Sequence, residues 1–210
     1  MRVKHLTSAL SAALAVAAVI VGCATAPNDA EVDAKATSML KASFKEQGQA
    51  KLDRLDQDDT QKVCSDYAGK APPKDIAERI EKTNLATIKW PADGKLLGDW
   101  ENGEKIAQEG RGMQYSDDPK GPVGANCYAC HQLAPQELSY GTIGPSLYQF
   151  GKLRGYTDEI RKYTYGKIFN AEAYSACTNM PRFGHKGILT EQQIKDVVAL
   201  LMDPASPVNK

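Results

Sequence analysis

The chain has little histidine, no excess of charge of either sign and one long hydrophobic run. Its 210 residues contain three histidines, and only His131 and His185 lie beyond residue 24. Basic and acidic residues number 26 each, so the formal net charge is zero. Without Arg2 and Lys4 near the N-terminus, 24 basic residues face 26 acidic ones. Nucleic-acid binding calls for a basic stripe or patch, so we expect no nucleic-acid partner.

The hydrophobic run lies at the N-terminus. Arg2 and Lys4 precede an alanine-rich apolar run over residues 9–21, and small residues follow it. The run is shorter than the roughly 20 apolar residues that a transmembrane helix needs. We therefore interpret residues 1–24 as a secretory signal peptide and expect a periplasmic protein.

Two ways of processing this leader fit the sequence. Ile20-Val21-Gly22-Cys23 resembles a lipobox, in which Cys23 is lipidated and becomes the mature N-terminus. The alternative is ordinary cleavage after Ala24. A single lipid chain holds a protein weakly, whereas several chains anchor it stably to a membrane.

Cysteine provides the clearest functional signal. The five cysteines are Cys23, Cys64, Cys127, Cys130 and Cys177. Two of them lie in Cys127-Tyr128-Ala129-Cys130-His131, the pattern of c-type haem attachment. Two thiols at this spacing can bond to the two vinyl groups on one edge of a porphyrin, and the imidazole that follows can reach the iron. The sequence therefore predicts one covalently attached haem c with His131 as an iron ligand.

The same cysteine pair has two other readings. A redox dithiol of the thioredoxin type belongs in a βαβ unit, and no strand pattern surrounds this pair. A structural zinc site needs a second pair of ligands nearby, whereas the other cysteines stand far away in the sequence. Haem attachment is the interpretation that fits.

Cys64 and Cys177 are left over. In an oxidising compartment two such cysteines most simply form a disulfide. The bond would close a loop of about 113 residues, which stabilises a fold by at most roughly 4–5 kcal/mol. The alternative is that one of them is a reactive thiol.

Three segments can be distinguished: the signal peptide at 1–24, a helical N-terminal extension at 25–94 and a haem domain at 95–210. In the extension, the composition of residues 29–58 favours a helix, and residues 75–87 form a second helical stretch.

The haem domain also reads as helical. We expect helices at 99–108, 157–165 and 170–173, and a last helix that begins with the capping box Thr190 to Gln193. No alternating strand pattern appears, so the predicted fold is all-α.

The second iron ligand decides the chemistry of such a site. The candidates after the attachment motif are Met180, His185 and Met202. Met202 ends the last amphipathic helix and is expected to pack there, and His185 is expected to be a solvent-exposed loop residue. Met180 precedes Pro181, whose fixed φ stiffens the loop. We therefore predict His131 and Met180 as the ligands, a pair that raises the haem potential relative to two histidines.

Two further expectations concern the surroundings of these ligands. A backbone carbonyl near Gly144-Pro145 is placed to accept the second ring N–H of His131. Cys177 lies three residues before Met180, so a bond to Cys64 would tie the extension to the ligand loop. We hypothesise that the extension braces this loop and that reduction of the disulfide loosens Met180.

These motifs occur in the order found in class I cytochrome c domains, which the region from Trp100 to Leu201 resembles. More narrowly, it resembles the SoxX family, the small cytochrome subunits of SoxAX complexes of thiosulfate oxidation. The matching blocks are Gly124 to His131, Tyr140 to Leu147, Gly151 to Gly155, Asn179 to Gly184 and Gly187 to Thr190.

The resemblance implies a heterodimer with a SoxA-type cytochrome that carries the catalytic cysteine. Such a heterodimer is an L-cysteine S-thiosulfotransferase, which joins thiosulfate oxidatively to a cysteine of the SoxYZ carrier protein. This chain would be its electron-transfer subunit, without catalytic residues of its own, and would pass electrons to a downstream cytochrome c. Lys152 and Arg154 would face the haem carboxylates, the partner or solvent.

Three alternatives remain open: a free-standing electron shuttle, a subunit of another periplasmic dehydrogenase, and an enzyme or sensor with an open iron position.

Overall fold

The computed structural model describes residues 28–67, 70–137 and 139–210, and the expected signal peptide with Cys23 lies outside them. Helices and loops make up these residues, with one isolated bridge between Gln47 and Ala50. The prediction of an all-α protein is confirmed. Within the same residues no helix has both the length and the hydropathy to cross a bilayer.

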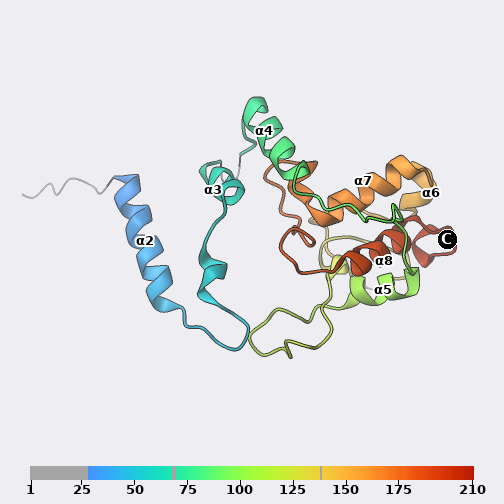
Figure 1. The fold of residues 1–210 in the computed structure, drawn as a ribbon, viewed down its shortest axis with the longest axis horizontal. Helices are drawn as coiled ribbons and strands as arrows, with labels where there is room; N and C mark the ends of the chain where they lie inside the picture. The colour runs from blue at the N-terminus through green and yellow to red at the C-terminus, as the bar shows by residue number, and fades with distance from the viewer. Residues whose placement is uncertain (1–27, 68–69, 138) are drawn as a thin grey trace, which may run out of the picture. The chain divides into compact units, whose positions relative to one another are not determined.

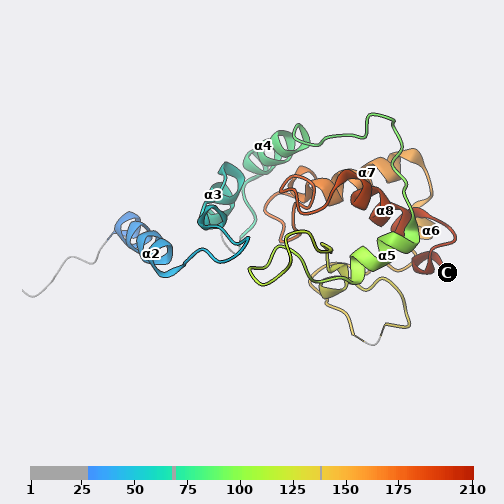
Figure 2. The same ribbon diagram turned by 60° about the horizontal axis from the view of Figure 1, so that its bottom comes forward.

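The helices follow one another along the chain as Figures 1 and 2 show. The α-helices are α2 (Asp29–Ser43), α3 (Asp59–Asp66), α4 (Lys74–Leu85), α5 (Trp100–Gln108), α6 (Phe150–Arg154), α7 (Asp158–Phe169) and α8 (Glu191–Met202). The 3-10 helices are η1 (Leu52–Leu55), η2 (Cys127–Ala129), η3 (Ala171–Ala173) and η4 (Pro207–Asn209).

The chain divides into two compact units, residues 1–45 and 46–210. In the first unit, α2 begins at its cap Asn28, whose side chain accepts a hydrogen bond from the Glu31 amide, and none of its residues is buried. The second unit contains every other element, so α3 and α4, which we assigned to the extension, share a unit with the predicted haem domain.

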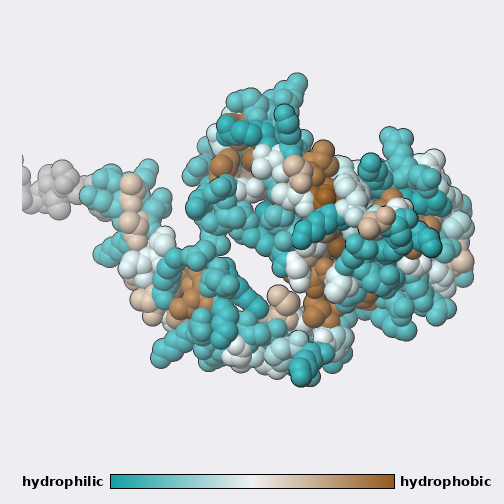
Figure 3. Space-filling model, in the orientation of Figure 1, coloured by the Kyte–Doolittle hydropathy of each residue, from teal (hydrophilic) through white to brown (hydrophobic). Residues whose placement is uncertain are grey.

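In the second unit α5 and α8 pack closely against each other. Gly103 of α5 lies against the α8 backbone, where a Cβ at this position would overlap the Asp196 carbonyl oxygen and lie 3.0 Å from the Leu200 Cβ. Helix α8 supplies most of the core, and its Ile194, Val198 and Met202 are fully buried. Figure 3 shows a band of hydrophobic residues over the left-hand ends of α7 and α8, while the surface at the right is mostly hydrophilic.

Several expected helix boundaries hold and others do not. Asp99 caps α5, and Thr190 and Gln193 form the expected capping box of α8. The helix expected over 29–58 ends at Ser43, where Phe44 adopts an extended backbone. The stretch at 170–173 is a 3-10 turn, since Asn170 is already extended.

The segment that links α4 to α5 covers α7. Tyr165, fully buried in α7, donates its hydroxyl hydrogen bond to the Lys89 carbonyl at 3.1 Å. The Trp90 ring packs on Tyr165 with 5.6 Å between centroids. The end of the extension is therefore joined to α7 by side-chain contacts as well as by the chain itself.

The contact at Gly103 gives a test of the helix crossing. Gly103→Ala gains helix propensity, yet its methyl group must push α8 away. We expect the free energy of unfolding to fall by about 1–3 kcal/mol, the usual cost of overpacking. Denaturant unfolding of the full-length protein measures it. Lys105→Ala, at an exposed position of the same helix, is the control and should stay within about 0.5 kcal/mol of the parent. An unchanged Gly103→Ala protein would contradict the close crossing.

Candidate haem site

A cavity of about 690 Å³ lies in the second unit. All four residues predicted to hold haem line it, namely Cys127, Cys130, His131 and Met180. Its volume falls within the usual 300–1,000 Å³ of sites for small molecules and cofactors. The fold thus brings the attachment motif and the distant methionine loop to the walls of one cavity.

Most of the cavity wall is apolar. The apolar lining residues from outside the attachment motif and the Met180 loop include Ala125, Ile143, Pro145, Leu147, Phe150, Ile168 and Leu201. The sequence did not predict that they line a cavity, because a wall residue and a core residue look alike in a hydrophobic pattern. Such a wall favours the burial of a large apolar ring.

The attachment motif is ordered by short-range backbone contacts. Asn126 adopts a left-handed conformation, and η2 follows it directly. The Cys127 carbonyl accepts the amide hydrogen bond of His131 at 2.9 Å, which places both cysteines and the histidine in one turn. Burial raises the pKa of the Cys127 thiol to about 12. A redox dithiol depends on a lowered thiol pKa, so this environment does not favour that reading.

The His131 ring has a fixed orientation. Its Nδ1 lies 2.7 Å from the Pro145 carbonyl oxygen. A carbonyl only accepts, so Nδ1 carries the hydrogen and donates it, and Nε2 keeps the lone pair that a metal needs. The expected carbonyl partner is therefore confirmed. Gly144 lies against the same ring, where any Cβ would overlap the imidazole.

The Met180 loop is joined to the extension by a disulfide between Cys64 and Cys177. This confirms the predicted pairing. Cys177 also lines the cavity, and its amide donates a hydrogen bond of 2.6 Å to the buried Glu172 carboxylate. The disulfide therefore ends at the cavity wall itself.

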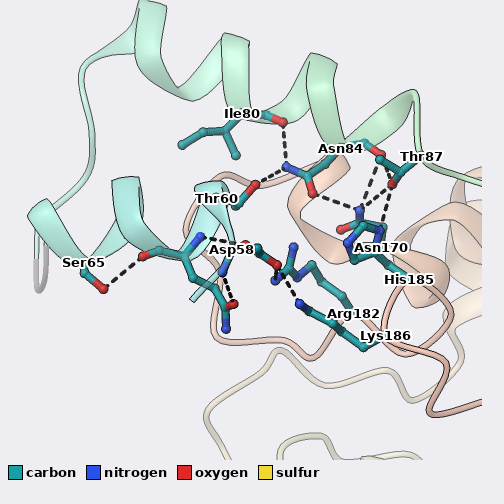
Figure 4. A network of polar contacts seen from close by, with 11 residues as sticks. Asp58, Thr60, Ser65, Ile80, Asn84, Thr87, Asn170, Arg182, His185 and Lys186 are labelled. Atoms are coloured by element: carbon teal, nitrogen blue, oxygen red, sulfur yellow. Dashed lines mark hydrogen bonds and ion pairs between the residues drawn. The ribbon is translucent and has the colours of Figure 1, made fainter. Parts of the chain in front are cut away.

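An ion-pair cluster involves residues that follow Met180 in the chain. Asp58 faces Arg182 and Lys186, at 2.6 and 2.7 Å from its Oδ2 atom (Figure 4). The Arg182 side chain is only 8% exposed. Burial alone raises the pKa of Asp58, but hydrogen bonds from Lys186, the Gln61 amide and Arg182 outweigh it and hold this pKa well below its usual value.

The two other candidate ligands lie away from the cavity. Met202 is fully buried in the core, as expected. The prediction that His185 is solvent-exposed is wrong: its ring is partly buried, with Nδ1 3.2 Å from the Thr87 hydroxyl. Burial, together with the positive charges of Arg182 and Lys186, lowers the pKa of His185.

Two basic side chains line the cavity. Arg154 extends over the rings of Phe150 and Tyr163, at 5.2 and 6.0 Å from their centroids. Lys167, which sequence analysis missed, donates a hydrogen bond to the Ala171 carbonyl at 3.1 Å. Lys152 is exposed and does not line the cavity.

Comparison with known proteins agrees with this site. Residues 100–203 match the family model described as Cytochrome c. The chain belongs to the cytochrome c family. It is also 42% identical over 158 residues to an uncharacterized lipoprotein of Aquifex aeolicus (strain VF5), with 73% of each chain covered. A cytochrome c carries covalently bound haem c and transfers electrons, and the paired thiols and oriented imidazole of this chain fit that group.

The Asp58 cluster gives a pH-dependent test. Asp58→Asn removes the charge that compensates Arg182, so we expect the free energy of unfolding to fall by about 1.5–3 kcal/mol, the range for a hydrogen bond to a charged group. The pKa of Asp58 is depressed in the folded state, so its stabilisation exists above the ordinary value of 3.8 and is lost as pH falls below it.

Denaturant unfolding at pH 7 and in steps below pH 4 measures this difference, which should shrink toward acid pH. Asp59→Asn is the control, because the Asp59 carboxylate is fully exposed. Its ion pair with Lys62, at 3.8 Å on the same helix face, is a surface contact that contributes little to stability. Equal effects of the two substitutions at pH 7 would contradict the assignment.

Proposed function

We propose that this chain is an exported one-haem cytochrome c with His131 and Met180 as axial ligands, and that it is the electron-transfer subunit of a SoxAX-type complex. One observation carries the ligand assignment: both side chains line the cavity that Cys127 and Cys130 also line. Haem c in such a site supplies a one-electron iron couple.

The chain's own residues prepare the site for electron transfer. The Nδ1–H of His131 donates to Pro145, which fixes the ring and raises the basicity of Nε2. The apolar walls exclude water. Arg154 and Lys167 are the basic side chains that would hold the haem carboxylates. Thioether ligation by Met180 favours the reduced iron and so suits a protein that accepts electrons.

The SoxAX role rests on the resemblance of the blocks from Gly124 to Thr190 to the SoxX family. The cysteines are consistent with it. Of the four that the structure describes, Cys127 and Cys130 belong to the attachment motif, while Cys64 and Cys177 form the disulfide. None is left as a catalytic thiol, so the thiosulfotransferase cysteine would lie on the SoxA-type partner. SoxYZ would be the carrier and a further cytochrome c the acceptor.

A lipid anchor at Cys23 forms part of the proposal. The Aquifex relative is named a lipoprotein, and Cys23 follows Gly22 in the pattern of a lipobox. A lipidated Cys23 would hold the complex at a periplasmic membrane surface.

Substitution of Met180 tests the ligand assignment. Met180→Ala should abolish the weak methionine-to-iron absorption band of the oxidised protein, lower the reduction potential and let carbon monoxide bind the reduced protein readily. Met202→Leu is the control, since this volume-conserving change in the core should leave the band and the potential as they are. A band that survives in Met180→Ala would refute the assignment.

Copurification tests the SoxAX role. The tagged protein is isolated from its own host grown on thiosulfate, and the masses of all co-eluting chains are measured. We expect a stoichiometric second cytochrome, and thiosulfate oxidation only when a carrier protein is added. The same masses show one haem on this chain and any lipid on Cys23. A lone haem-bearing monomer would instead favour the free-standing electron shuttle.

A further inference from the structure

Two points of the ligand loop, one on each side of Met180, are fixed to a single short helix. Three residues before Met180, Cys177 is bonded to Cys64 in α3. Two residues after it, Arg182 is ion-paired with Asp58, which is the N-cap of α3. We propose that α3 is a splint for the ligand loop, and that Asp58 and Cys64 are positioning residues that hold Met180 on the iron. This inference rests on the proposed ligation by Met180.

Neither anchor is an ordinary surface contact. The Arg182 side chain is 8% exposed. A buried charge that loses its partner is strongly destabilising, so separating Arg182 from Asp58 has a large free-energy cost. Lys186 binds the same carboxylate oxygen. At the other end, the bond between Cys64 and Cys177 is covalent.

The splint is itself fixed to the rest of the unit. Asn84 of α4 donates a hydrogen bond to Thr60 in α3 at 3.0 Å, and its side-chain oxygen accepts one from Asn170 at 3.0 Å (Figure 4). Asn170 follows directly after α7, whose residues also line the cavity. A chain of contacts therefore connects the α3 anchors to α7 and so to the cavity wall.

The ligand loop is hydrogen-bonded beyond Met180, where the Gly184 and His185 amides donate to the Phe169 carbonyl at 3.0 Å, but it has little such support at Met180 itself. No helix or strand occurs between η3 and α8 in the described chain. Close to Met180, the hydrogen bond from its amide to the Thr178 hydroxyl is a local one of 3.3 Å. A neutral thioether is a weak ligand, so a loop that is ordered in advance avoids a conformational cost that binding would otherwise have to meet.

The test uses the full-length haem-bearing protein with either or both anchors removed. Asp58→Asn removes the charge, yet asparagine caps helices as well as aspartate does, so α3 keeps its N-cap. Cys64→Ala with Cys177→Ala removes the covalent anchor. A phosphine reductant, followed by alkylation of the two freed thiols and only then by reoxidation of the iron with ferricyanide, removes it without any substitution.

Carbon monoxide reports the fraction of reduced protein in which methionine has left the iron, because it binds only that fraction. We expect its association rate to rise about tenfold or more when both anchors are lost, with a weaker methionine-to-iron band and a lower potential. Loss of one anchor should give a smaller change in the same direction. Asp59→Asn, one residue from Asp58, should change none of the three.

Circular dichroism and denaturant unfolding identify the variants that still fold. Folded variants with an unchanged band, potential and carbon monoxide rate would overturn the splint, while leaving ligation by Met180 intact. If Met180→Ala also leaves the band unchanged, then the ligand assignment has failed and the splint with it. Gly103→Ala is a further control, since it should destabilise the fold without touching either anchor. If its reduction potential falls as much as that of the anchor variants for the same loss of stability, the effect is a general one of destabilisation, and this too would overturn the inference.

Discussion

The close crossing of α5 and α8 is the constraint on which the cavity depends. Only glycine at position 103 lets the two backbones approach this far, because any Cβ would overlap the carbonyl of Asp196. The crossing leaves the Leu201 side of α8 free to form cavity wall, while Ile194, Val198 and Met202 fill the core. The attachment motif is linked to α5 by the backbone, since the Ala125 amide donates to the Ile106 carbonyl at 2.9 Å. The helix contact therefore contributes to the position of the proximal ligand.

The two sides of the cavity are built by different means. On the proximal side, residues 141–147 lie along the attachment motif, and amide hydrogen bonds from Gly141, Gly144 and Leu147 join the two segments. The distal side has such backbone bonds only away from Met180, where the Gly184 and His185 amides donate to the Phe169 carbonyl at 3.0 Å. Its loop is held by a distant part of the chain, through the disulfide and through Asp58. A histidine can rely on local order because imidazole binds iron well, whereas a thioether depends more on the order of the loop that carries it.

The sequence predicted the parts of the site whose signal is local. The attachment motif, the capping box at Thr190 and a carbonyl near Pro145 as the partner of His131 all depend on residues close together in the chain. The disulfide came from counting cysteines. The Asp58–Arg182 ion pair and the Asn84–Asn170 contact had no such signal, because a polar residue that will be paired by folding looks like any surface residue. His185 was misjudged for this reason, since the Thr87 partner lies 98 residues away.

Helix α3 shows how the two long-range features depend on each other. It has eight residues, whereas an isolated helix shorter than about 12–15 residues is marginal in water. The capping box of Asp58 and Gln61 satisfies its first amides, but local capping contributes only about 1 kcal/mol. Most of its stability must then come from the anchors to Cys177 and Arg182 and from Thr60 against Asn84. Helix α3 and the ligand loop therefore stabilise each other. We expect them to fold and to unfold locally as one cooperative unit, distinct from the core of α5 and α8.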